Sequence, residues 1–253
     1  MMQMRYYTDE KNLQIIMALL KAYNIRKIIT SPGTTNHTLV ASMQNDEWFE
    51  MYSSVDERSA AYMACGLCAE SGEPVVITCT EATASRNYMP GLTEAYYRKL
   101  PVLAITTTHG ADKVGQHLAQ VIDHSTLPND IAMYHAYIPS CHSSKDETLT
   151  AFKVNEALLE LSHRGGGPVY LNVESVASRN YLVKELPAVR KLERYTYSDK
   201  LPELPSGKIG IFVGSHKKWS ESEILAIERF CEVNNAVVFC DHTSGYHGKY
   251  HVT

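Results

Sequence analysis

The chain reads as an α/β protein with a doubly wound parallel sheet, and three features support this. Through residue 175, short apolar runs rich in β-branched residues alternate with amphipathic stretches of helical period. Residues 74–80 (PVVITCT) and 101–106 (PVLAIT) are continuous apolar runs, typical of strands buried on both faces of a parallel sheet. Apolar residues make up 44% of the 253 residues, enough for a sizeable core.

Helices and strands are expected in regular alternation. The turn sequence Ser31-Pro32-Gly33 ends the first strand, and two acids in the first turn, with Gly72 at the end, bound a helix. In chain order we expect a helix capped by Thr8, strand 27–30, helix 37–44, strand 49–55, helix 56–72, strand 74–80, helix 83–97, strand 101–106, helix 145–163 and strand 168–173. Five or six strands with helical crossovers define a doubly wound sheet.

The chain is expected to contain one domain, a linker and the start of a second domain. Prolines among charged and polar residues mark the linker, and afterwards strand 209–213, a helix near 220–234 and strand 236–241 restart a β-α-β pattern. So short a piece would leave an unfinished sheet edge, so we expect the second α/β domain to be incomplete. The predicted boundaries are 1–178, 179–206 and 207–253.

Composition excludes several classes of protein. Lys and Arg (24) against Asp and Glu (28) give a net charge of −4 without a long basic stretch, which argues against a nucleic-acid binder. No apolar run reaches the roughly 18 residues that span a bilayer, and residues 1–7 lack a signal-peptide core. We therefore expect a cytoplasmic protein without a membrane partner. Its six cysteines are expected to be mostly buried thiols.

The best-marked candidate site is residues 54–61 (SVDERSAA), where a strand is followed by a helix. Ligands of doubly wound sheets bind at this carboxyl end of the strands. An acid such as Glu57 can bind a ligand there, or it can simply favour the N-terminus of the helix. The spacing alone leaves both interpretations open.

Seven segments together resemble one family. In order they are SPG (31–33), VDERSA (55–60), SGEPV (71–75), TEATASRNY (80–88), LTEAYY (92–97), PVL (101–103) and QVID (120–123). Their order and spacing resemble the N-terminal, pyrimidine-binding domain of thiamine-diphosphate-dependent enzymes, especially the menaquinone-pathway synthases. The resemblance covers most of residues 10–175.

The resemblance implies a catalytic role for Glu57. In such enzymes this glutamate hydrogen-bonds N1′ of the cofactor's aminopyrimidine and favours its 4′-imino tautomer, while the cofactor carries the organic chemistry. The resemblance further assigns cofactor-binding positions to Pro32, Gly33, Thr83, Asn87 and Gln120. Glu81 and Ala82 depart from the family, which has Ser-Gly at these two places.

The resemblance also points to two substrate-binding positions. Thr35 and His109 stand where the menaquinone-pathway synthases have arginines. Neither threonine nor neutral histidine replaces the bidentate grip of a guanidinium on a carboxylate. We therefore expect a less anionic substrate than the dianionic acid of that pathway.

Half of the expected active site is missing from the sequence. The family binds magnesium and the cofactor's diphosphate through a Gly-Asp-Gly segment in a C-terminal domain, and no Gly-Asp-Gly occurs here. The resemblance thus implies a transferase or lyase that decarboxylates a 2-oxo acid, with carboligation or proton capture. It would work as a homodimer or tetramer, and this chain would be inactive without a diphosphate-binding domain in cis or in trans.

Other signals favour packing or remain as alternatives. Cys65 and Cys68 have redox spacing but lie inside a helix, and Cys240 with the nearby histidines lacks a metal-binding spacing, so no metal ligand is predicted. A non-catalytic binding or regulatory module with the same fold is the main alternative. A nucleotide-binding protein is a weaker one, because Gly-x-Gly-x-x-Gly is absent.

Overall fold

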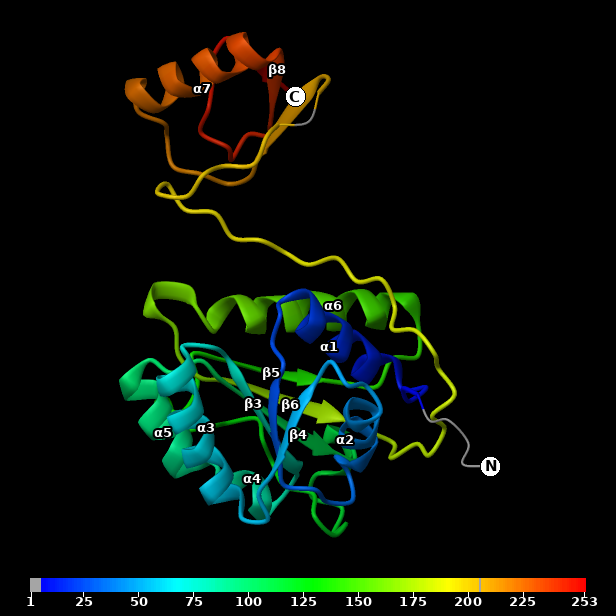
Figure 1. The fold of residues 1–253 in the computed structure, drawn as a ribbon. Helices are drawn as coiled ribbons and strands as arrows, with labels where there is room; N and C mark the ends of the chain where they lie inside the picture. Colours follow the sequence, from blue (N-terminus) through cyan, green and yellow to red (C-terminus); the bar gives the residue numbers. More distant parts are fainter. Residues whose placement is uncertain (1–5, 205) are drawn as a thin grey trace. The chain divides into compact units, whose positions relative to one another are not determined.

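Six parallel strands form the sheet of the first of two units, which ends at Arg194 (Figure 1). The computed structural model describes residues 6–204 and 206–253, so residues 1–5 and Pro205 of the predicted linker lie outside the described residues. The strand order is β2-β1-β3-β4-β6-β5. The strands are β1 (Lys27–Thr30), β2 (Glu50–Ser53), β3 (Val75–Thr80), β4 (Val102–Thr108), β5 (Tyr134–Ile138) and β6 (Val169–Glu174).

This strand order confirms the doubly wound sheet. The chain passes from β1 to β2 on one side and then returns to β3 on the other side of β1, and both pairings are parallel. The winding therefore reverses between β1 and β3. The carboxyl ends of these two strands form the topological switch point, where open α/β sheets bind ligands.

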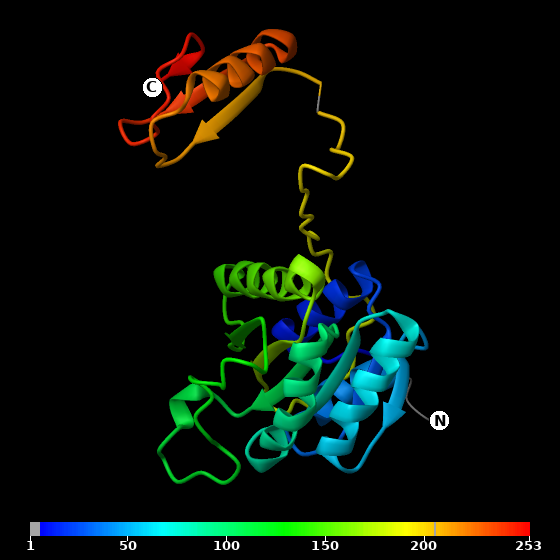
Figure 2. The same ribbon diagram turned by 90° about the vertical axis from the view of Figure 1, so that its left-hand side faces the viewer.

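Helices cover both faces of the sheet (Figures 1 and 2). Side chains of one strand alternate between two cores: Val75 and Ile77 pack with α3 and α5, whereas Val76 packs with α1 and α6. This alternation explains the continuous apolar runs of the central strands. The helices are α1 (Lys11–Ala22), α2 (His37–Gln44) and α6 (Ser144–Glu160) on one face, and α3 (Glu57–Ser71), α4 (Thr83–Asn87) and α5 (Met89–Arg98) on the other.

Three details differ from the sequence expectations. Thr8 does not cap α1, which starts at Lys11; the Thr8 hydroxyl accepts a hydrogen bond from Glu10 N instead. The expected helix 83–97 is divided into α4 and α5, because Pro90 has no N–H to continue the helical hydrogen bonds. Strand β5 was not expected: it lies at the edge of the sheet, and only two of its five residues are buried. Two short 3₁₀ turns, Ala111–Lys113 and His163–Gly165, complete the unit.

The second unit begins at Tyr195 and holds a parallel sheet in the order β7-β8-β9. Its expected strand–helix–strand pattern is confirmed, and α7 starts at a capping box formed by Ser220 and Glu223. The short strand β9 was not expected. The elements are β7 (Ile209–Val213), α7 (Glu221–Asn234), β8 (Ala236–Cys240) and β9 (His251–Val252).

The predicted linker up to Arg194 falls within the first unit. Val183 forms an antiparallel bridge with Tyr7, and Leu192 N donates to Asn155 Oδ1 at 2.8 Å. The stretch up to Leu192 is therefore held by hydrogen bonds to the first sheet's helices and N-terminal segment. The three domain boundaries stay predictions.

Two further sequence expectations concern the cysteines and membrane-spanning helices. All six cysteines are free, and burial raises the pKa of Cys65 to about 11 and of Cys68 to about 12, which fits core packing rather than redox chemistry. In the part of the chain that the structure describes, no helix is both long and apolar enough to cross a membrane.

Candidate active site

The carboxyl end of β2 leads directly into α3, and this junction presents Glu57. The side chain of Asp56 caps the helix by accepting hydrogen bonds from Ser59 N at 2.8 Å and from Ser59 Oγ at 2.6 Å. Glu57 is the first helical residue and is half-buried. The cap thus fixes the backbone from which the Glu57 carboxyl group projects, and the helix N-terminus favours its negative charge.

A second segment brings an amide to this carboxyl group. Asn87 is the last residue of α4, the short helix after β3, and its Nδ2 donates to Glu57 Oε2 at 3.2 Å. The sequence predicted that both residues contact the cofactor, but it could not predict that they hydrogen-bond each other. The structure brings together two polar groups from the crossovers that follow β2 and β3.

The turn after β1 is tightly packed against β3. Gly33 N donates to Asn36 Oδ1 at 2.7 Å, and a Cβ at Gly33 would lie 2.8 Å from Thr80 Cγ2. A side chain would therefore collide with the end of β3, so glycine is required by close approach. Pro32 is exposed beside it. Both residues lie at the switch point, and their cofactor contacts stay predictions.

The departure from the family at Glu81 and Ala82 has a visible backbone consequence. Ala82 has φ 66° and ψ −134°, a conformation that glycine adopts readily and alanine rarely. It precedes Thr83, the exposed first residue of α4. An alanine thus occupies a backbone conformation typical of glycine.

The remaining candidates lie apart from Glu57. Thr35 is buried, and its hydroxyl donates to Thr107 O at 2.8 Å while bonding the hydroxyls of Thr80 and Thr107. His109 is exposed just after β4, and Gln120 is exposed in the following loop with φ 61°. Within the described residues, none of these three side chains hydrogen-bonds Glu57, and their roles stay predictions.

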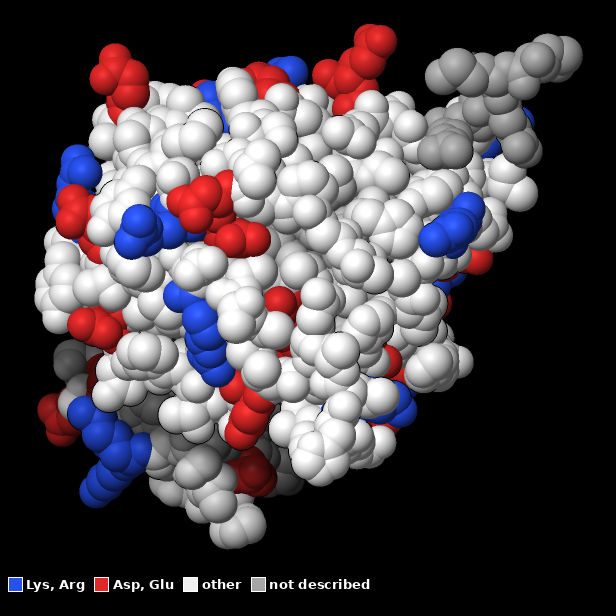
Figure 3. Space-filling view, turned by 90° about the horizontal axis from the view of Figure 1, so that it is seen from below, with Lys and Arg blue, Asp and Glu red and all other residues white. Residues whose placement is uncertain are grey.

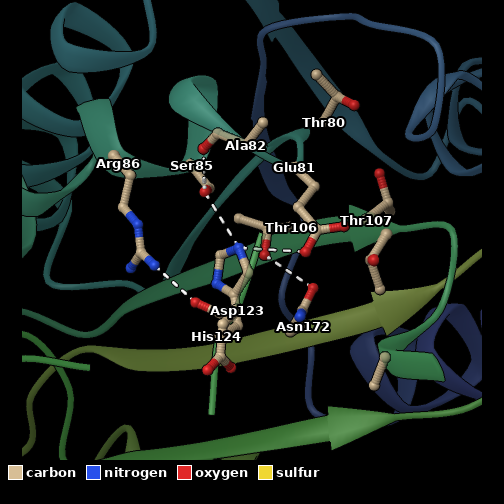
Figure 4. Close-up of polar contacts among 12 residues, drawn as sticks. Thr80, Glu81, Ala82, Ser85, Arg86, Thr106, Thr107, Asp123, His124 and Asn172 are labelled. Carbon is tan, nitrogen blue, oxygen red and sulfur yellow. Dashed lines mark hydrogen bonds and ion pairs between the residues drawn. The ribbon is translucent and has the colours of Figure 1, made fainter. Parts of the chain in front are cut away.

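The structure reveals a polar cluster that sequence reasoning missed (Figure 4). His124 is buried, with Nε2 3.5 Å from Glu81 Oε1 and 3.4 Å from Ser85 Oγ, and with Nδ1 3.3 Å from the Tyr170 hydroxyl. Arg86 Nη2 donates to the carbonyl oxygen of Asp123 at 2.8 Å and ties the His124 loop to α4.

This cluster is not an ion pair near neutral pH. Burial, reinforced by the Arg86 charge, lowers the pKa of His124 to about 4, so the imidazole is neutral. Burial also raises the pKa of Glu81. The sequence had one signal for this cluster, the unusual Glu81; nothing marked His124 as its partner.

Within the described residues, neither the surface charge nor the arrangement of potential metal ligands indicates a further binding site. On the face in Figure 3, Lys and Arg are dispersed among acidic and uncharged residues. Among residues 6–204 and 206–253, no three His, Cys, Asp or Glu side chains are placed to hold a metal ion. The aminopyrimidine end of thiamine diphosphate nevertheless fits this site. Glu57 Oε1 accepts no hydrogen bond from the described residues and is therefore available to a group of the cofactor.

Comparison with known proteins identifies the class. Residues 11–127 match the family model described as thiamine pyrophosphate enzyme, N-terminal TPP binding domain. The resemblance expected from the sequence is thereby confirmed.

The similar proteins described below are synthases that share the same name. The chain is 36% identical over 190 residues to the 2-succinyl-5-enolpyruvyl-6-hydroxy-3-cyclohexene-1-carboxylate synthase of Phocaeicola vulgatus, covering 75% of this chain and 34% of the relative. It is 35% identical to the synthase of Bacteroides thetaiotaomicron with the same coverage. The match to the Porphyromonas gingivalis synthase is 28% over 250 residues, 94% of this chain and 43% of the relative. The chain thus spans about a third of the first two relatives.

Proposed function

We propose that this chain supplies the aminopyrimidine-activating part of a thiamine-diphosphate-dependent enzyme, with Glu57 as its acid–base residue. The observation that carries the proposal is the Glu57–Asn87 hydrogen bond at the carboxyl edge of a sheet of this family. When bound, thiamine diphosphate supplies the electron sink for decarboxylation of a 2-oxo acid.

Each residue of the pair has a defined task. Asn87 donates to Glu57 Oε2 and so fixes the rotation of the carboxyl group, which would leave Oε1 free to hold N1′ of the aminopyrimidine. Glu57 then holds or releases one proton at that nitrogen. Pro32, Gly33 and Thr83 lie at the same end of the sheet, and Gln120 is proposed to bind the cofactor from the loop after β4.

The acceptor that reacts with the 2-oxo acid is proposed to carry fewer negative charges than the dianionic acid of the menaquinone pathway. Thr35 and His109 carry no guanidinium, and the Thr35 hydroxyl is already engaged with Thr80 and Thr107. A second carboxylate on the acceptor would lack a bidentate partner at either place. The reaction class remains transferase or lyase, as decarboxylation with carboligation or proton capture.

The other half of the site is proposed to lie outside these residues. Magnesium and the diphosphate need ligands that a further domain would supply, in cis or in trans, in a homodimer or tetramer. As the sequence predicts, we propose that the assembled enzyme works in the cytoplasm and that this chain alone is inactive.

The test is release of CO₂ from 2-oxo acids. This chain is assembled with a diphosphate-binding domain encoded downstream or in an adjacent reading frame, and supplied with thiamine diphosphate and magnesium. We expect CO₂ from the assembled enzyme and none from the chain alone. With the same 2-oxo acid, release should be faster with a monoanionic acceptor than with a dianionic acceptor. Turnover by the chain alone would refute the composite site, and an assembly that binds no cofactor would refute the function.

A second candidate is a binding or regulatory module without catalysis. The observation that favours it is the buried Glu81 behind a strained Ala82, where the family has Ser-Gly. The absence of any diphosphate-binding domain encoded nearby, together with failure to bind the cofactor, would select this candidate.

A further inference from the structure

Helix α4 connects the Glu57 carboxyl group with the loop that follows β4. Asn87 Nδ2 donates to Glu57 Oε2 at 3.2 Å. The preceding residue, Arg86, donates from Nη2 to the carbonyl oxygen of Asp123 at 2.8 Å, as Figure 4 shows. Successive residues of a helix project about 100° apart, so a single turn of α4 reaches both partners. The position of the loop is therefore linked to that of the Glu57 side chain through one short helix.

A buried histidine makes a second tie between this loop and α4. The Ser85 hydroxyl donates its one hydrogen to Ala82 O at 2.7 Å, so Ser85 Oγ accepts from His124 Nε2, which lies 3.4 Å away. His124 Nδ1 then accepts from the Tyr170 hydroxyl at 3.3 Å. These two contacts select the tautomer of the neutral ring that carries its proton on Nε2.

Burial and stacking also fix the ring of His124. The residue is buried, and its ring stacks on that of Tyr170 with the centroids 5.9 Å apart and the planes inclined by 28°. The Tyr170 hydroxyl accepts in turn from Thr106 Oγ1 at 2.9 Å, so β4 holds the partner of His124. Through this one ring, the loop is attached both to the sheet and to α4.

These ties lie close to Gln120, for which a cofactor contact is proposed. An extended chain covers at most about 11 Å over the three residues from Gln120 to Asp123. Gln120 is exposed and has φ 61°, a left-handed conformation that residues other than glycine rarely adopt. Such a conformation persists where the surroundings hold the backbone. The ties at Asp123 and His124 supply such a hold.

We propose that Arg86 and His124 form a loop clamp that holds Gln120 in position toward a cofactor bound at Glu57. The loop clamp consists of the contacts that α4 makes with Asp123 and His124. Arg86 and His124 are positioning residues, because they act through Gln120. The inference rests on the proposed function, and it makes α4 the common support of Glu57 and of the loop.

The first measurement uses the full chain without cofactor. NMR of the His124 side-chain nitrogens should show the Nε2–H tautomer. Arg86→Met keeps the length of the side chain but removes its donors, so the signals should move toward the tautomer mixture of an exposed histidine. Arg98→Met, a matched change at the end of α5, should leave them unchanged. Identical His124 signals in Arg86→Met and in the unchanged chain would overturn the clamp.

The second measurement is thiamine diphosphate binding by the chain assembled with a diphosphate-binding domain and magnesium. Gln120→Ala and Arg86→Met should each raise the dissociation constant of the cofactor by about tenfold. In Arg86→Met, exchange of the C2 proton at saturating cofactor should fall by no more than about threefold, because the Glu57–Asn87 hydrogen bond remains. Arg86→Lys, which keeps one donor for the loop carbonyl, should restore most of the affinity. An unchanged affinity in Arg86→Met would overturn the inference.

A double variant separates positioning from general destabilisation. If Arg86 acts through Gln120, Arg86→Met should weaken cofactor binding by less than about twofold further once Gln120→Ala is present. Additive losses would show that the two residues act independently and would overturn the inference. If the unchanged assembly bound no cofactor, the proposed function and the role of Gln120 would both fail, whereas a bound cofactor with additive losses rejects the loop clamp alone.

Discussion

Two glutamates at the carboxyl edge of the sheet have opposite surroundings. Glu57 is half-buried at the start of α3 and receives a hydrogen bond from Asn87. Glu81 is buried with one oxygen unpartnered and a neutral imidazole beside the other. The first carboxyl group is partly open to solvent, whereas burial raises the pKa of the second.

At the residue scale, Ala82 predicts a stability change. Because its φ of 66° strains any side chain, Ala82→Gly should raise the free energy of unfolding by about 1 kcal/mol, after the extra flexibility of glycine in the unfolded chain is subtracted. The matched control is Ala84→Gly inside α4, which should lower it by about 0.5–1 kcal/mol. Urea denaturation of both variants measures this. Destabilisation by Ala82→Gly would show that the turn is unstrained.

His124 predicts a pH dependence. Its folded pKa of about 4 lies below the ordinary 6.5, so the unfolded state binds more protons between these values. The stability contribution is complete above pH 6.5 and is lost as the pH falls towards 4. The raised pKa of Glu81 acts in the opposite sense, so NMR titration of the His124 ring is the direct measure. A midpoint near 6.5 would contradict the buried cluster.

At the element scale, α3 connects the cap to the candidate site. Its bounds followed closely from the sequence, because an acid at the start and Gly72 at the end are strong local signals. Two features that the sequence did not predict have non-local causes. Edge position weakened the apolar pattern of β5, and the Glu57–Asn87 contact joins segments that only the sheet brings together.

The cap of α3 can be tested separately. Asp56→Ala should lower the free energy of unfolding by about 1 kcal/mol, because Ser59 N loses its acceptor, and Asp56→Ser should keep most of that stability. Chemical denaturation gives both values. If Asp56→Ala were as stable as the unchanged chain, the cap would not be what fixes the start of α3.

At the scale of the whole molecule, the sheet gathers the candidate residues at one edge. Crossovers after β1, β2 and β3 bring Gly33, Glu57 and Asn87 to the switch point, and the loop after β4 carries Gln120. The fold class was predictable because the strand pattern is local, and the motif order singled out Glu57, whose role stays a prediction. The polar cluster of Glu81 and His124 was not predictable, since Glu81, His124 and Tyr170 meet only after folding.

The most direct test of the central claim is exchange of the thiazolium C2 proton of thiamine diphosphate, followed by NMR. The enzyme is one in which this chain replaces the matching third of the Phocaeicola vulgatus relative. Glu57→Gln should slow exchange by about 10²–10⁴-fold, and Asn87→Ala by about tenfold. The control Glu70→Gln, at the far end of α3, should leave it unchanged. Equal exchange with Glu57 and with Gln at that position would contradict the account.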